Sequence, residues 1–207
     1  MRTRVKICGI TRPEDALHAV DFGADAIGLI FTARSPRHVE LEQAREIAAA
    51  VGPLVTVVGL FLDPRADEVE AVLSRVSVDM LQFHGEESPA FCEAFGRRYL
   101  KAVPMGGDSD PEAYAARYRR ASGFVLDSHA VGGRGGTGER FDWQRVPKLP
   151  KPILLAGGLT PDNVAEAIRA CCPYGVDVSS GIEAAKGIKD TRKLAAFIDE
   201  VRRVGHD

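Results

Sequence analysis

The stretch VKICGITRPEDALHAVDFGADAIGLIF, residues 5–31, decides the fold. It begins with a short apolar run (Val5–Cys8), continues through a polar segment with helical spacing (Pro13–Asp21), and ends in a second apolar run (Ala26–Phe31). Nearly continuous apolar runs are typical of parallel strands that are covered on both faces. The turn after the first run reads CGITRPED and lacks the GxGxxG fingerprint of dinucleotide-binding open sheets. The stretch therefore predicts one strand–helix–strand unit of a different α/β fold.

The same rhythm continues along the chain. Further short apolar runs predict strands at Val55–Phe61, Met80–Phe83, Leu100–Val103, Gly123–Leu126, Pro152–Ala156 and Val176–Ser179. Helical spacing predicts helices at Leu41–Val51, Arg65–Val76, Ser88–Phe95, Asp110–Arg120, Pro161–Cys171 and Thr191–Val204. The sixth connection is poor in helix, because Phe141–Val146 offers only about one turn or two. Thr11 is the candidate N-cap of the first helix.

Chain length decides between an open sheet and a barrel. Eight strand–helix units divide the 207 residues into about 26 residues each, which is enough for a strand, a helix and two short loops. Eight such units leave no residues for a second domain, whereas doubly wound open sheets more often have about five or six strands. We therefore expect residues 1–207 to form a single domain, a compact α/β barrel of the (βα)8 or TIM-barrel class with a parallel sheet.

Composition excludes several classes of protein. Apolar residues make up 45% and charged residues 27% of the chain, as in ordinary globular proteins. The net charge of −2 gives no footprint for nucleic acid, and no apolar run approaches the roughly 18 residues of a membrane span. We read no signal peptide, and Cys8, Cys92, Cys171 and Cys172 lack the CxxC spacing of zinc sites. We therefore expect a cytoplasmic protein that binds neither nucleic acid nor a membrane, with the last three cysteines as inert packing residues in helices.

Polar residues interrupt the predicted strands on one face. Alternation of side chains directs this set towards the barrel axis: Lys6, Cys8, Gln82, His84, Asp127, Asp177 and Ser179. Polar groups are costly to bury without partners, and barrel enzymes place their chemistry at the carboxyl ends of the strands. The convergence therefore predicts an active site there.

Two glycine-bearing turns predict a phosphate site. Gly157 and Gly158 follow the seventh strand, and Ser179, Ser180 and Gly181 follow the eighth. Barrels commonly bind phosphate through free backbone N–H groups of these two turns. The alternative is that the glycines only make tight turns.

Each candidate side chain also has an interpretation without chemistry. An inward cysteine such as Cys8 is usually a core residue, and a strand-end aspartate such as Asp127 is often a helix cap. Arg37 follows the second strand, where arginines are usually solvated. His84 can serve as a hydrogen-bonded structural histidine.

The motifs together resemble a known family. In order, the chain carries VKICGIT, GLIF followed by SPR, LQFHG, LDS, GGTGERFDW, LAGGLTPDNV and GVDVSSGIE. This series, from Val5 to about Asp190, is similar to N-(5′-phosphoribosyl)anthranilate isomerase of tryptophan biosynthesis. The resemblance implies a cofactor-free Amadori rearrangement of a phosphosugar, with no metal, in a monomer or homodimer.

The resemblance also implies roles for residues. It makes Cys8 the general base and Asp127 the general acid, and Arg37 suits the aromatic carboxylate of the substrate. His84 either contacts substrate or is structural. Asp177 binds a ribose hydroxyl, pairs with Lys6, or does both. From their positions in the sequence, Lys6 favours the Cys8 thiolate and Gln82 is a buried hydrogen-bonding partner. The Gly-rich stretch 131–138, which includes Arg134, forms either a lid or a disordered surface loop.

Other functions stay open at this point. A second phosphosugar barrel enzyme, such as indole-3-glycerol-phosphate synthase or ribulose-phosphate epimerase, would use lysines or paired aspartates with metal-binding histidines. A bifunctional histidine/tryptophan isomerase would carry aspartate at the position of Cys8. A non-catalytic module that binds a phosphate ligand is the alternative outside enzymes.

Overall fold

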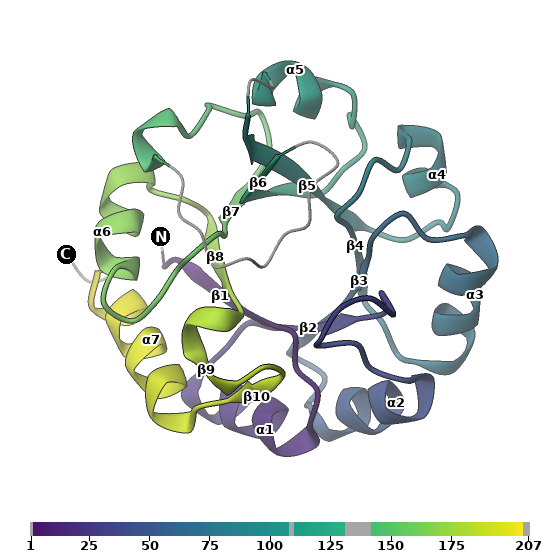
Figure 1. The fold of residues 1–207 in the computed structure, drawn as a ribbon, viewed down its shortest axis with the longest axis horizontal. Coiled ribbons are helices and arrows are strands. Elements are labelled where there is room, and N and C mark those ends of the chain that lie inside the picture. The colour runs from purple at the N-terminus through teal and green to yellow at the C-terminus, as the bar shows by residue number, and fades with distance from the viewer. Residues whose placement is uncertain (1, 108–109, 131–141, 205–207) are drawn as a thin grey trace.

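The computed structural model describes residues 2–107, 110–130 and 142–204. Within them, eight parallel strands form a closed barrel in chain order, with β1 paired to β8 (Figure 1). The strands are β1 (Arg4–Cys8), β2 (Ala26–Ile30), β3 (Thr56–Phe61), β4 (Met80–Phe83), β5 (Tyr99–Gly106), β6 (Gly123–Ala130), β7 (Ile153–Leu155) and β8 (Gly175–Val178). The predicted α/β barrel is confirmed.

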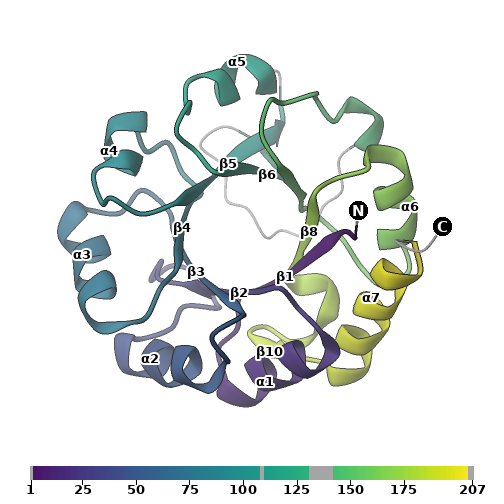
Figure 2. The ribbon, with the colours of Figure 1, turned by 180° about the vertical axis from the view of Figure 1, so that it is seen from behind.

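Helices surround the barrel, as both faces of the molecule show (Figures 1 and 2). They are α1 (Pro13–Phe22), α2 (Leu41–Ala50), α3 (Ala66–Arg75), α4 (Pro89–Glu93), α5 (Pro111–Ala116), α6 (Val164–Cys171) and α7 (Thr191–Val204). Between β6 and β7, the described residues contain only the short 3₁₀ helix η1 (Trp143–Arg145), in line with the one or two turns that the sequence predicted there. None of the described helices is both long and apolar enough to cross a membrane.

Local sequence signals explain several helix starts and correct one expectation. Ser88 caps α4 by accepting from Phe91 N, and Asp110 caps α5; a proline follows each cap. Thr11 does not cap α1. The Thr11 hydroxyl donates instead to the carbonyl of Gly187. The N-cap position is occupied by Arg12, which makes no side-chain cap bond.

Several element boundaries differ from the sequence expectation. Helices α4 and α5 end earlier than predicted, whereas β5 and β6 extend further and pair beyond Leu126. Asp127 consequently lies within β6, opposite Pro104, instead of just after the strand. After β8 the chain forms η2 (Ser180–Ile182) and a hairpin of β9 (Glu183–Ala185) and β10 (Ile188–Lys189), which the sequence analysis did not predict.

Alternation along the strands separates a large outer cluster of buried residues from two small inner clusters. Val5 and Ile7 belong to the large cluster between the barrel and its helices, whereas Cys8 belongs to a small cluster inside the barrel with Ile30 and Leu60. Parallel strands covered on both faces require this arrangement. Cys8, Ile30 and Leu60 all line the cavity that holds the polar groups of the site.

Candidate active site

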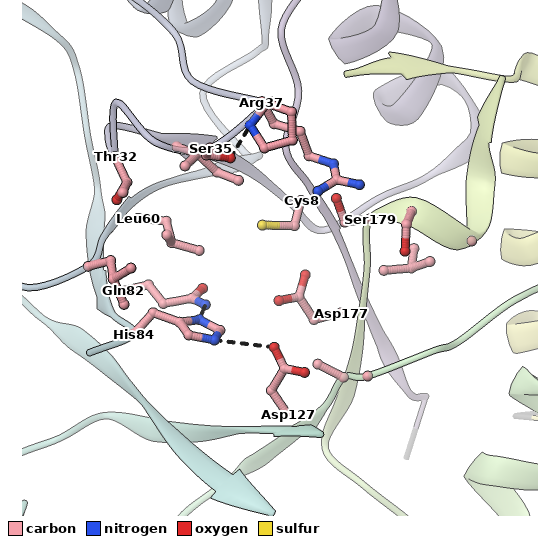
Figure 3. A pocket seen from close by; sticks show the side chains of 18 of the residues that line it. Cys8, Thr32, Ser35, Arg37, Leu60, Gln82, His84, Asp127, Asp177 and Ser179 are labelled. Carbon is pink, nitrogen blue, oxygen red and sulfur yellow. Dashed lines mark hydrogen bonds and ion pairs between the residues drawn. The ribbon is translucent and has the colours of Figure 1, made fainter. Parts of the chain in front are cut away.

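A cavity of about 400 Å³ opens at the carboxyl ends of the strands (Figure 3). All of the predicted site residues line it: Cys8, Arg37, His84, Asp127, Gly157, Gly158, Asp177, Ser179, Ser180 and Gly181. They come from β1, β6 and β8 and from the loops after β2, β4, β7 and β8. The geometry thus brings together groups that are up to 173 positions apart, while their chemical roles stay predictions.

Cys8 ends β1 and is 6% exposed. Burial raises the pKa of its thiol above the ordinary value, and the ammonium groups of Lys6 and Lys189 act against this rise without cancelling it. The expected help from Lys6 is therefore present, but desolvation is the larger effect. The free thiol is the resting form that this environment favours at neutral pH.

Lys6 and Asp177 form a buried ion pair beside Cys8. The Lys6 Nζ atom donates to both carboxylate oxygens of Asp177, at 2.9 and 2.8 Å, and neighbouring strands bring the two residues into register. Burial lowers the pKa of Lys6, but its interactions with Asp177 and with Cys8 together outweigh this and raise it overall. Lys6 therefore stays charged, and the predicted pairing inside the barrel is confirmed.

Asp127 and His84 form a second polar group in the cavity. The His84 Nε2 atom lies 3.2 Å from Asp127 Oδ2, and Ser128 Oγ donates to Asp127 Oδ1 at 3.3 Å. On the other side of the ring, Gln82 Nε2 lies 3.5 Å from His84 Nδ1. In the view of Figure 3, Asp177 lies between this group and Cys8, and all three carboxyl and thiol groups point into the same space.

Arg37 lines the cavity but already has an acidic partner. Its Nε and Nη2 atoms bind the two oxygens of Glu183 at 2.7 and 2.8 Å, and the residue is 8% exposed. Burial acts against ionisation of Glu183, but the hydrogen bonds from Arg37 and Lys189 outweigh it and lower the pKa of that carboxyl. The interpretation of Arg37 as a solvated surface residue is therefore wrong.

The two glycine turns are packed against each other. Gly157 and Gly158 have φ values of +80° and +62°, in the left-handed region that residues other than glycine rarely adopt. A Cβ atom on Gly181 would lie 1.8 Å from the carbonyl oxygen of Leu159, in the turn after β7. Glycine at 181 is therefore required for the close approach of the two turns, both of which line the cavity.

A profile of the N-(5'phosphoribosyl)anthranilate (PRA) isomerase family matches residues 5–200. The chain belongs to this family. An N-(5'-phosphoribosyl)anthranilate isomerase of Halorhodospira halophila is 55% identical over 203 residues, covering 98% of both chains. One of Pseudomonas fluorescens is 57% identical over 201 residues, covering 97% of this chain and 96% of the relative. The resemblance drawn from the motifs, and the isomerase of tryptophan biosynthesis that it implied, are confirmed.

Solved phosphoribosylanthranilate isomerases share the fold. The Thermotoga maritima enzyme has a TM-score of 0.86 at 38% identity, covering 97% of this chain and 99% of its own. A second structure, at 36% identity and a TM-score of 0.83 over 97% and 99% of the chains, holds reduced 1-(o-carboxyphenylamino)-1-deoxyribulose 5-phosphate. Monomers made from the dimeric T. maritima enzyme have also been solved. The oligomeric state of this family member stays a prediction.

Two charged residues near Arg37, Glu183 and Lys189, were not predicted from the sequence. Glu183 joins Arg37 to Lys189, whose Nζ atom lies 3.1 Å from Glu183 Oε1 and also donates to the carbonyl of Ser179. Glu183 ends the GVDVSSGIE motif, so a signal for it was present. Lys189 carried no signal, because its position depends on the unpredicted hairpin β9–β10.

The other cysteines lie away from the cavity. Cys92 is buried in α4, where burial raises its pKa to about 12, and the half-buried Cys171 has a pKa raised to about 11 by burial. Cys172 is exposed in the left-handed conformation after α6, so the expectation that it packs inside a helix was wrong. Among the described residues, no group of three or more histidine, cysteine or acidic side chains is arranged to hold a metal ion. The predicted lid at 131–138, with Arg134, lies outside the described residues.

Proposed function

We propose that the cavity converts N-(5'-phosphoribosyl)anthranilate to 1-(2-carboxyphenylamino)-1-deoxyribulose 5-phosphate by acid–base chemistry of Asp127 and Cys8. One observation carries this proposal: a carboxyl group on β6 and a thiol on β1 point into the same buried cavity (Figure 3). An Amadori rearrangement needs one acid and one base at neighbouring carbon and oxygen atoms. The two groups meet that need without another reactive group.

The first step is opening of the ribofuranose ring. Asp127 donates a proton to the ring oxygen, the C1′–O bond breaks, and the anthranilate nitrogen forms a Schiff base with C1′. His84 lies beside this carboxyl group, with its Nε2 atom 3.2 Å from Asp127 Oδ2. His84 therefore orients the carboxyl group and shares the charge that remains after the donation.

The second step is removal of the proton from C2′. The Cys8 thiolate accepts it, the C2′ electrons form a double bond to C1′, and the Schiff-base nitrogen becomes the amine of an enolamine. Tautomerisation of this enolamine gives the aminoketose product. Lys6 and Lys189 lower the cost of forming the thiolate in a site where burial opposes it.

Two sets of candidate binding groups line the cavity. The turns containing Gly157 and Gly181 offer backbone N–H groups to the phosphate. The guanidinium edge of Arg37 that does not bind Glu183 is available for the anthranilate carboxylate. Asp177 accepts from a ribose hydroxyl while it stays paired with Lys6. The solved relative that holds the reduced product analogue supports a phosphosugar ligand of this size.

The test follows the fluorescence of phosphoribosylanthranilate generated in the assay. The protein as it stands should consume it quickly, while Cys8→Ser and Asp127→Asn should each lose at least about a hundredfold in kcat, as is typical for removal of a general acid or base. Binding of the reduced product analogue, measured by calorimetry, should survive in both variants. Rapid decay in either variant would overturn the role of that residue, and no decay with the unsubstituted protein would overturn the function.

A further inference from the structure

Another buried ion pair lies outside the barrel wall, beside α4 and α5. Lys101 on β5 has a fully buried side chain, and its Nζ atom lies 3.3 Å from Oε2 of Glu87, whose side chain is 2% exposed. The rings of Tyr114 and Tyr118 cover the ammonium group, with their centroids 5.6 and 5.3 Å from Nζ. Neither charged residue lines the cavity, so the proposed chemistry does not use them directly.

The pair fixes the main chain between β4 and α4. The Lys101 Nζ atom donates to the carbonyl oxygens of Phe83, at 3.2 Å, and of Gly85, at 2.6 Å. The Glu87 carboxylate accepts from the backbone nitrogen of Gly85 at 3.1 Å and from that of Asp63, in the neighbouring loop after β3, at 2.9 Å. One buried charge pair therefore holds the residues directly before and after position 84, and ties their loop to the next one.

His84 lies between Phe83 and Gly85, the two residues whose carbonyl oxygens accept from Lys101. Its backbone nitrogen also donates to the carbonyl of Phe61 on β3 at 2.9 Å, so the peptide on each side of it is bonded. With the main chain fixed, the direction of the Cα–Cβ bond is fixed, and the imidazole reaches Asp127. A loop without these bonds would leave that direction to thermal motion.

We propose that Lys101 and Glu87 are positioning residues, which act from outside the barrel to hold His84 against Asp127. The inference rests on the proposed role of Asp127 as the general acid. Supporting groups of this kind matter because a misplacement of about 1 Å can cost about a hundredfold in rate. An ion pair that only stabilised the fold would not need to grip the two carbonyls that flank one cavity residue.

The test replaces the pair by neutral residues of similar size, Lys101→Met with Glu87→Gln, so that no charge is left buried alone. We expect kcat to fall about tenfold with KM within about twofold, and we expect the ¹⁵N chemical shifts of the His84 ring in the free protein to change. In an Asp127→Asn background, the same pair of substitutions should cause no further loss of kcat, because the lost contact is already absent. Val103→Ala is the matched control: Val103 is fully buried two positions further along the same strand and carries no charge.

The control should lose stability while its kcat and His84 ring shifts stay unchanged. A folded double variant with unchanged ring shifts and unchanged kcat would overturn the proposal, and so would an equal fractional loss in the Asp127→Asn background. If the double variant does not fold, Glu87→Gln alone is measured by the same criteria, because it keeps the shape and the Lys101 contacts. The ring shifts are recorded without substrate, so they test the positioning even if the protein fails to turn over phosphoribosylanthranilate.

Discussion

Gly181→Ala is the sharpest perturbation of the predicted phosphate site. The added Cβ atom would lie 1.8 Å from the backbone oxygen of Leu159 and 3.2 Å from Cγ2 of Thr160. Ordinary contact begins at 3.4 Å, so the turns after β7 and β8 must separate by roughly 1.6 Å. The nearest atom belongs to the backbone, so a change of rotamer cannot relieve the clash.

The expected cost follows from this displacement. Backbone N–H groups of the two turns can no longer all donate to one phosphate when one turn moves by more than 1 Å. A shift of this size costs about a hundredfold in positioning, which corresponds to about 2.8 kcal/mol. We therefore expect kcat/KM to fall by about this factor, most of it through a higher KM, and the inhibition constant of inorganic phosphate to rise.

The assay compares Gly181→Ala with Gly52→Ala, whose Cβ would meet no atom within 4 Å. Both variants are first checked for a cooperative urea transition, and the control should keep the kinetics of the unsubstituted protein. A Gly181→Ala variant that is folded and is inhibited by phosphate as strongly as the unsubstituted protein would refute the assignment of the two turns.

Three further predictions concern the charged groups of the cavity. Burial raises the pKa of Cys8, and only the thiolate can accept a proton, so kcat/KM should still be rising with pH at about 8.5, the ordinary pKa of a thiol. A pH–rate profile that reaches its plateau by about pH 7 would contradict this. Lys6→Met leaves the Asp177 carboxylate buried alone and should lower the free energy of unfolding by about 3–5 kcal/mol in urea denaturation, and a loss below 1 kcal/mol would mean that the pair is not desolvated. The Arg37→Lys variant lacks the planar guanidinium that can bind Glu183 and a ligand carboxylate at the same time, so KM should rise about tenfold with kcat little changed. An unchanged KM in steady-state kinetics would remove Arg37 from substrate binding.

Strand periodicity made much of the site predictable. Period-two alternation in β1 and β8 directs Lys6 and Asp177 inward, and parallel pairing in register then brings them together. The same rule places Cys8 above Lys6 and places Gln82 and His84 on the cavity side of β4. These inferences need only the strand positions and the order of strands in the barrel.

Contacts made by irregular segments were beyond that reasoning. Glu183 and Lys189 meet Arg37 through a short hairpin that has no regular apolar pattern in its sequence. Asp127 was expected after a strand that in fact continues, because β5 and β6 pair past the end of the apolar run. The grip of Lys101 on the loop after β4 depends on a charged side chain that packs outside the sheet, where the pattern favours an apolar residue.

Closure of the barrel between β1 and β8 has a consequence for synthesis on the ribosome. Lys6 is synthesised 171 residues before its partner Asp177, so β1 is made well before the strand that pairs with it. At roughly 5–20 residues per second, the edge of β1 waits on the order of ten seconds for its partner. A chain released before β8 would carry an unpaired strand edge and an ammonium group without its counter-ion, so truncated products are expected to be substrates for chaperones and proteases instead of weakly active enzymes.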